Sequence, residues 1–174
     1  MADLDLLNQN LAGEHFAIAA YDAALGSGLL DEPTAKVARA FQSDHKTHRD
    51  LLTEQVVARD GTAVSPFGAD DYAKSYPPLT TAAEIIAYAT ELEAGAARAS
   101  IASVAGFEDR KLALLAAQIG GVEAQHWAIL LAAVGANPVP SPLIELDGME
   151  QADYATASTI PGSPRERDPG EPKG

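Results

Sequence analysis

Residues 119–130 read IGGVEAQHWAIL and carry a carboxylate and an imidazole one helical turn apart. Glu123 and His126 are three residues apart, which keeps them on one helix face together with Ile119 and Leu130. A face that carries large aliphatic residues is the one that a helix buries. We therefore predict that this ionisable pair lies inside the protein. The alternative is an exposed pair, because Glu and His are also common on helix surfaces.

Apolar residues recur at steps of three and four on both sides of this stretch and predict helices of similar length. The four expected helices span about residues 4–26, 32–60, 81–106 and 109–134. Thr81 and Glu84 form a capping-box pattern at the start of the third helix. The expected buried stripe of the second helix is Val37, Phe41, His45, His48, Leu52 and Gln55.

The segment between the second and third helices cannot continue a helix, because residues 61–79 contain three prolines. It predicts a long crossing connection between two helical hairpins, which is one of the standard topologies of a four-helix bundle. We expect an all-α domain over residues 1–136. Residues 137–174 are Pro-rich and predict a largely disordered tail, most clearly over 161–174.

Composition narrows the function classes. The 174 residues fit one domain, and 25 acidic against 12 basic side chains give a net charge of -13, which disfavours nucleic acid as a partner. The chain has no Cys, which excludes disulfides, thiolate metal sites, iron–sulfur clusters and Cys nucleophiles. No signal peptide and no run of ~20 apolar residues is visible, so we expect no membrane partner and a cytoplasmic protein.

Other ionisable residues also fall in the apolar stripes. Glu14 shares its face with Leu7 and Leu11, and His45 and His48 lie on the inner side of the second helix. A neutral imidazole can also be satisfied in a core by a backbone carbonyl, which is the alternative for both histidines. His15 follows Glu14 but lies off its stripe, so we expect it at the surface.

The third helix offers a choice between two carboxylates. Glu84, Glu91 and Arg98 are seven residues apart and define a polar stripe that faces solvent. Glu93 shares its side of the helix with Ile86 and is the expected inward residue. A modest rotation of the helix would bring Glu91 inward instead.

Three carboxylates and three imidazoles that converge in a core would be costly without a compensating positive charge. A pair of metal ions is the simplest compensation, because a Glu together with Glu-x-x-His elements builds di-metal sites in helical bundles. These ligands suit iron, with zinc or manganese as alternatives, and iron is favoured for oxygen chemistry. Tyr21 lies two turns after Glu14 and is the candidate catalytic side chain that supplies or relays an electron, unless it is an ordinary core residue.

Four short motifs resemble the ferritin-like superfamily, which includes ferritins, bacterioferritins and rubrerythrin-type proteins. They are EHFAIAAY (14–21), HRDLL (48–52), YPP (76–78) and the Leu-Glu pair at 92–93. They are most similar to those of uncharacterised bacterial ferritin-like domains, and the resemblance covers about residues 3–136. It implies a ferritin-like bundle in which the candidate metal ligands are Glu14, His48, Glu93, Glu123 and His126.

One position departs from the family pattern, because His45 stands where a Glu would precede His48 by three residues. Asp44 is a substitute ligand to consider. The exchange weakens the case for a bridging carboxylate and makes a single ion, or zinc, more plausible than in an ordinary ferritin.

Two functions follow from these patterns. The first is a metal-binding protein with two iron ions that oxidises Fe(II) or reduces O2 or peroxide. The second is a non-catalytic ferritin-like scaffold with a vestigial or single-metal site, acting as a homodimer or through a partner. For Trp127 we expect packing between helices or at a dimer surface.

Overall fold

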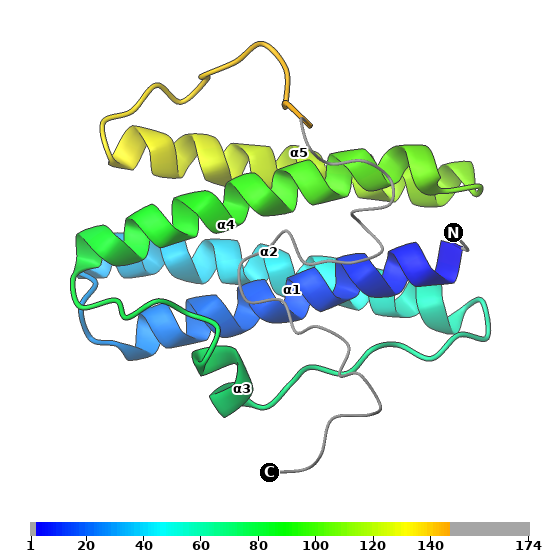
Figure 1. Cartoon of the computed structure of the whole chain (residues 1–174), viewed down its shortest axis with the longest axis horizontal. Coiled ribbons are helices and arrows are strands. Elements are labelled where there is room, and N and C mark those ends of the chain that lie inside the picture. The colour runs from blue at the N-terminus through cyan, green and yellow to red at the C-terminus, as the bar shows by residue number, and fades with distance from the viewer. Residues whose placement is uncertain (1–2, 147–174) are drawn as a thin grey trace.

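The computed structural model describes residues 3–146, and the regular structure within that range is helical throughout. Four long helices lie side by side and form a bundle, as the sequence predicts (Figure 1). The elements are α1 (Asp3–Gly26), α2 (Glu32–Val57), α3 (Ala69–Ala73), α4 (Ala82–Ser103), the 3-10 turn η1 (Val104–Gly106) and α5 (Arg110–Ala133). None of the helices in this range is both long and apolar enough to cross a membrane.

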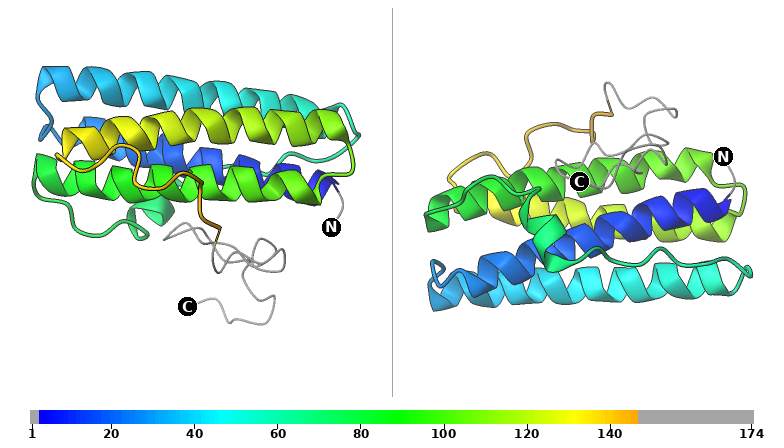
Figure 2. Two further views of the ribbon diagram at one scale, coloured as in Figure 1. Left: turned by 90° about the horizontal axis from the view of Figure 1, so that it is seen from above. Right: turned by 60° about the horizontal axis from the view of Figure 1, so that its bottom comes forward.

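The bundle consists of two hairpins, because α1 packs mainly on α2 and α4 mainly on α5. The segment between α2 and α4 runs the length of the bundle along its outside and joins the two hairpins (Figures 1 and 2). The sequence predicts this connection but not the short helix α3 within it. Tyr72 of α3 is buried and lies edge-on to Phe16 of α1, with 5.9 Å between the ring centroids. This contact attaches the connection to α1.

Side chains at the helix starts explain where the helices begin. Asp31 caps α2, since its carboxylate accepts a hydrogen bond from the Thr34 backbone N–H at 2.9 Å. Thr81 and Glu84 form the expected capping box at the start of α4. Asp109 accepts a hydrogen bond from the Lys111 N–H at the start of α5. These caps fix the register at which α4 and α5 enter the bundle.

Two apolar layers lie one on each side of the middle of the bundle. One is built from Leu7, Leu11, Leu52, Val56, Leu112 and Ile119. The other is built from Tyr21, Ala38, Phe41 and Leu130. The sequence positions between these layers hold the ionisable residues of the stripes, so both ends of that region are closed to water.

The prediction that Val37 begins the buried stripe of α2 is wrong. Val37 is 38% exposed, whereas Ala35 and Ala38 are buried. Ala has no side chain beyond Cβ, so burying these two positions lets α2 approach its neighbours closely. The helix therefore turns Val37 toward the outside.

Neighbouring glycines on α5 give a test of this packing. A Cβ on Gly120 would lie 2.9 Å from both Cγ1 and Cδ1 of Ile101 on α4, whereas a Cβ on Gly121 would meet no heavy atom of the described part within 4 Å. Ala is the better helix former, so Gly121→Ala is expected to raise the free energy of unfolding by about 0.5–1 kcal/mol. Gly120→Ala is expected to lose that gain and to destabilise by about 1 kcal/mol or more, because the Ile101 side chain must move or the helices must separate.

Urea unfolding of the two variants beside the wild-type protein measures this difference. Equal stabilisation by both substitutions would contradict the close approach of α4 and α5 at Gly120.

Candidate metal centre

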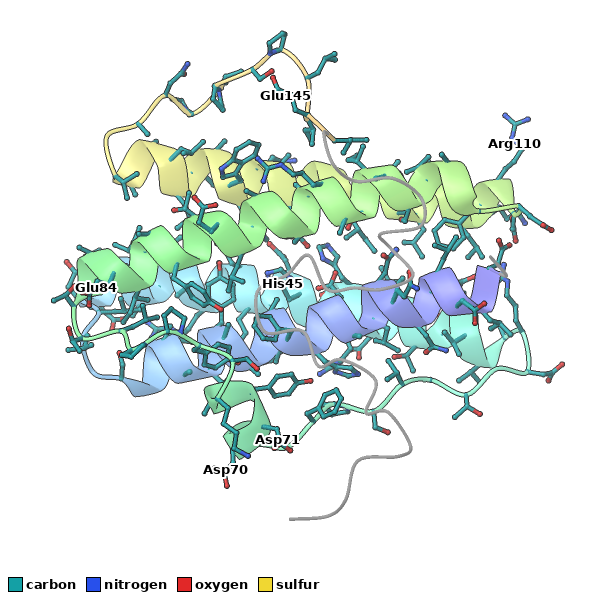
Figure 3. The ribbon with its side chains drawn as sticks, in the orientation of Figure 1. His45, Asp70, Asp71, Glu84, Arg110 and Glu145 are labelled. Carbon is teal, nitrogen blue, oxygen red and sulfur yellow. The ribbon has the colours of Figure 1, made fainter. Side chains whose placement is uncertain are left out.

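Four helices send ionisable side chains into one buried cluster between the two apolar layers. Each of these six residues is at most 6% exposed. The cluster contains Glu14 from α1, His45 and His48 from α2, Glu93 from α4, and Glu123 and His126 from α5. Figure 3 shows His45 in the middle of the bundle, between the two hairpins. We call this set the six-residue cluster.

His45 is the centre of the cluster. Its Nδ1 lies 2.8 Å from Oε2 of Glu14, and its Nε2 lies 3.2 Å from Oε1 of Glu93. The same Nδ1 is 3.5 Å from Oε1 of Glu123. One imidazole therefore connects carboxylates from three other helices.

His48 and Glu123 have an unusual relation. His48 Nδ1 lies 2.9 Å from Glu123 Oε1 and 3.6 Å from Glu14 Oε1. Both Nδ1 and the Glu123 Oε1 are buried, yet neither makes a hydrogen bond of acceptable geometry within the described residues. The short distance without hydrogen-bond alignment means that the two atoms do not point directly at each other. Donor atoms that face a shared space in this way are suited to a common cation.

His126 occupies the opposite side of the cluster. Its Nδ1 lies 3.2 Å from Oε2 of Glu123 and 3.3 Å from Oε2 of Glu93. Its Nε2 lies 3.1 Å from a carboxylate oxygen of Asp44. A carboxylate that accepts a hydrogen bond from one protonated ring nitrogen leaves the other nitrogen free to bind a metal.

The structure distinguishes between the alternative inward residues that the sequence leaves open on α2 and α4. The side chain of Asp44 is 51% exposed and meets only the outer nitrogen of His126, so His45 takes the inward position on α2. On α4, Glu91 is exposed and Glu93 is buried. The role of Asp44 beside His126 is one that the sequence analysis missed, because that contact joins residues 82 positions apart.

Aromatic residues cover one side of the cluster. The Tyr21 hydroxyl donates a hydrogen bond to the Glu93 carboxylate, and its ring centroid lies 5.6 Å from that of His45. Phe41 stacks on His126 with 3.9 Å between the ring centroids. His15, expected at the surface, is instead half-buried, and its Nε2 lies 3.1 Å from the Val64 carbonyl oxygen in the connection. It plays no part in the cluster.

The donor atoms form two groups of four, each with all atoms within 4.8 Å of one another. The first group is Glu14, His45, His48 and Glu123, and the second is His45, Glu93, Glu123 and His126. Glu123 turns one oxygen toward each group, and His45 turns one ring nitrogen toward Glu14 and the other toward Glu93. The arrangement has the pattern of two adjacent cation positions that share two residues.

The metal-free cluster can balance its own charge through its imidazoles. Burial lowers the pKa of His48, but the nearby carboxylates of Glu123 and Glu14 outweigh it and raise this pKa to about 9. Burial likewise lowers the pKa of His126, and the carboxylates of Glu123 and Glu93 raise it to about 10. The pKa of His45 is also well above its usual value, because its hydrogen bonds with Glu14 and Glu93 outweigh burial.

The pKa values of the three buried carboxyl groups shift in different directions. Burial raises the pKa of Glu93, but hydrogen bonds from His126 and His45 outweigh it, so the pKa lies well below its usual range. The pKa of Glu14 is lowered in the same way by His45 and His48 against the effect of burial. For Glu123 burial is the larger effect, and the pKa is raised. Cations that enter the cluster must therefore displace protons from imidazoles.

Known proteins provide an independent comparison. A family model described as a ferritin-like domain matches residues 2–136. No curated protein matches the chain. Among solved structures, a conserved hypothetical protein of Mycobacterium tuberculosis is similar, with a TM-score of 0.67 and 22% sequence identity. The match covers 80% of this chain and 96% of that chain, and it shows a shared fold.

The raised imidazole pKa values predict how the stability of the metal-free protein changes with pH. A group whose pKa is higher in the folded state than its value of about 6.5 in the unfolded state stabilises fully below pH 6.5. That contribution is lost as the pH rises through the folded values of about 9 for His48 and about 10 for His126. We expect the free energy of unfolding in the presence of a chelator to decline steadily between pH 6.5 and pH 10.

Urea unfolding at a series of pH values measures this slope. The double variant His48→Gln/His126→Gln is expected to flatten it. A wild-type stability that is constant or rises from pH 7 to pH 10 would contradict the pairing of the imidazoles with the carboxylates.

Proposed function

The chain belongs to the ferritin-like domain family, and on this premise we propose that the six-residue cluster binds two metal ions. We further propose iron as the metal and oxidation of Fe(II), or reduction of O2 or peroxide, as the activity. The observation that supports the proposal is the pair of four-residue donor groups that share His45 and Glu123 in the dry centre of the bundle. A buried, ferritin-like cluster of Glu and His is compatible with metal binding.

The donor set fits the proposed ions. Oxygen and imidazole nitrogen ligands suit iron, manganese and zinc, and the chain offers no thiolate. The first ion would be held on its outer side by Glu14 and His48, and the second by Glu93 and His126. Glu123 would contribute one oxygen to each. Two iron ions would supply the electrons for the reduction of O2 or peroxide.

The surrounding residues would prepare the site for this chemistry. The apolar layers exclude water, which strengthens the attraction between the carboxylates and a cation. Asp44 would hold the proton on His126 Nε2 and orient the ring, as carboxylates do beside metal-binding histidines. Burial and the charge of Glu93 raise the pKa of Tyr21 well above its usual value, so the phenol stays protonated and donates to that carboxylate. This position makes Tyr21 the proposed electron relay.

A second candidate function rests on His45. The imidazole contacts Glu14 and Glu93 with its two nitrogens, so it connects these carboxylates in the absence of any ion. A protein that uses this hydrogen-bonded network alone, or that binds one ion or zinc, would be a non-catalytic ferritin-like scaffold. A cytoplasmic location and a homodimer remain predictions, as does the role of Trp127. The Trp127 ring lies under the Arg98 guanidinium, 5.3 Å from the ring centroid.

Metal content tests the main proposal. Protein purified after iron supplementation is expected to carry about two ions per chain. Glu123→Ala is expected to abolish binding, because this variant removes a ligand from both positions. Glu93→Ala should lose at least one ion, and Glu91→Ala, two residues away and exposed, should lose none. Elemental analysis of the four proteins gives the stoichiometry.

O2 consumption after addition of Fe(II) then separates the two candidate functions. The metal-binding enzyme is expected to consume O2 and the Glu123→Ala variant is not. Less than roughly a tenth of an ion per chain in the wild-type protein would contradict metal binding. Bound metal without O2 or peroxide consumption would favour the scaffold.

A further inference from the structure

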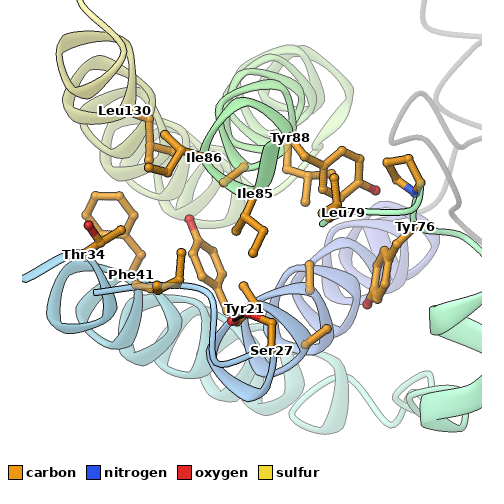
Figure 4. A pocket seen from close by; sticks show the side chains of 18 of the residues that line it. Tyr21, Ser27, Thr34, Phe41, Tyr76, Leu79, Ile85, Ile86, Tyr88 and Leu130 are labelled. Carbon is orange, nitrogen blue, oxygen red and sulfur yellow. Dashed lines mark hydrogen bonds between the residues drawn. The ribbon is translucent and has the colours of Figure 1, made fainter. Parts of the chain in front are cut away.

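A cavity of about 420 Å³ lies at the end of the bundle where the α1–α2 turn meets the start of α4. Figure 4 shows Tyr21, Phe41 and Leu130 along one side and Tyr76, Tyr88 and Leu79 along the other. We propose that this cavity binds an uncharged, largely apolar small molecule. Binding at this site does not depend on metal in the six-residue cluster.

The lining determines the charge of the occupant. Among residues 3–146, the side chains that line the cavity include no Asp, Glu, Lys, Arg or His, and most are Ala, Leu, Ile, Pro or aromatic. A charged group inside would lose its hydration without gaining an opposite charge, which is unfavourable. Apolar atoms, in contrast, gain from leaving water. The occupant is therefore uncharged and mostly hydrocarbon.

The cavity also has room for a molecule of useful size. An apolar cavity of about 150 Å³ is sufficient for benzene. A volume of 420 Å³ therefore accepts roughly ten to fifteen non-hydrogen atoms. This volume lies within the range that small-molecule sites occupy in proteins.

Two tyrosine rings close one side of the cavity, but their hydroxyl oxygens do not face into it. The hydroxyl oxygens of Tyr76 and Tyr88 are buried and have no hydrogen-bond partner among the described residues. Both tyrosines contribute to the cavity wall, and their ring centroids are 6.2 Å apart. Burial raises the pKa of Tyr88 to about 12 and raises that of Tyr76 as well, so both groups remain O–H donors. Because both hydroxyls are shielded from the cavity, an occupant would contact the apolar faces and edges of these two rings.

The cavity shares a wall with the six-residue cluster. The Tyr21 ring lines the cavity, and its hydroxyl donates a hydrogen bond to Glu93. The Phe41 ring also lines the cavity and stacks on His126. An occupant therefore lies one aromatic side chain away from the cluster. The cavity is therefore adjacent to the proposed metal site, but the residues that bind the occupant are those of the cavity alone.

Three ten-carbon probes test the proposal on the full chain. Isothermal titration calorimetry at pH 7.5 compares decan-2-one, which is neutral and has one acceptor, with decanoate and decylammonium. We expect one molecule of decan-2-one per chain and at least about tenfold weaker binding of both charged probes. A chelator is expected to leave the affinity for decan-2-one unchanged, so loss of metal binding and loss of this site are distinguished.

Substitutions then locate the site. Ala89→Phe and Ala24→Phe fill the cavity from two different helices and are expected to abolish binding. Ala87→Phe is the matched control, because Ala87 is exposed on the same helix as Ala89 and does not line the cavity. Tyr88→Phe removes only a hydroxyl that is shielded from the cavity, so it is expected to leave the affinity for decan-2-one unchanged. Thermal unfolding of the free Tyr88→Phe protein is expected to be unchanged or shifted upward.

Three results would overturn the proposal. One is the absence of decan-2-one binding up to its solubility limit. Another is equal binding by the Ala87→Phe variant and by both cavity-filling variants after each is shown to fold by circular dichroism. The last is a charged probe that binds as tightly as decan-2-one.

Discussion

His45 contacts Glu14 through one ring nitrogen and Glu93 through the other, at a depth where water has almost no access. Three carboxylates buried together repel one another and lose their hydration, so positive charge between them stabilises the cluster. In the metal-free protein that charge comes from protonated imidazoles, and His45 stands at their centre. The apolar layers at both ends follow from the same constraint, because water entering the cluster would weaken each of these attractions.

The same constraint explains why the two candidate functions lie so close together. A Glu at position 45, which the resemblance to ferritin-like proteins implies, would leave a cluster with more negative charge and a stronger demand for cations. The imidazole lowers that demand, and it can also offer a nitrogen to each of two neighbouring groups. Glu123 offers an oxygen to each group as well. The chemistry of the site therefore depends on whether cations can displace the protons that the imidazoles hold.

Much of the fold could be predicted from the sequence because its signals are local. Helix ends marked by Thr81 with Glu84, and by Pro33 near the start of α2, lie at most a few residues from the bounds in the structure. The inward side of α5 could be predicted because the aliphatic residues Ile119 and Leu130 share a helix face with Glu123 and His126. The orientation of α2 was predicted less well, since the exposed position of Val37 results from close helix packing on the two buried alanines.

The remaining features depend on contacts between distant parts of the chain. The partnership of Asp44 with His126 requires α2 and α5 to meet at a particular height. Glu93 is inward as the sequence predicts, but only the rotation of α4 excludes the alternative Glu91, and packing on α5 determines that rotation. The cavity exists because the connection brings Tyr76 and Pro77 against the bundle end, and no local pattern encodes that placement.

Anomalous diffraction from crystals soaked in Fe(II) under reducing conditions tests the central claim most directly. Data collected on both sides of the iron absorption edge identify the element, the number of ions and the residues around each. We predict two iron peaks about 3.5–4 Å apart, one beside Glu14 and His48 and the other beside Glu93 and His126. Glu123 should lie between them. A bundle without an anomalous peak, in which His45 still contacts both Glu14 and Glu93, would contradict this prediction.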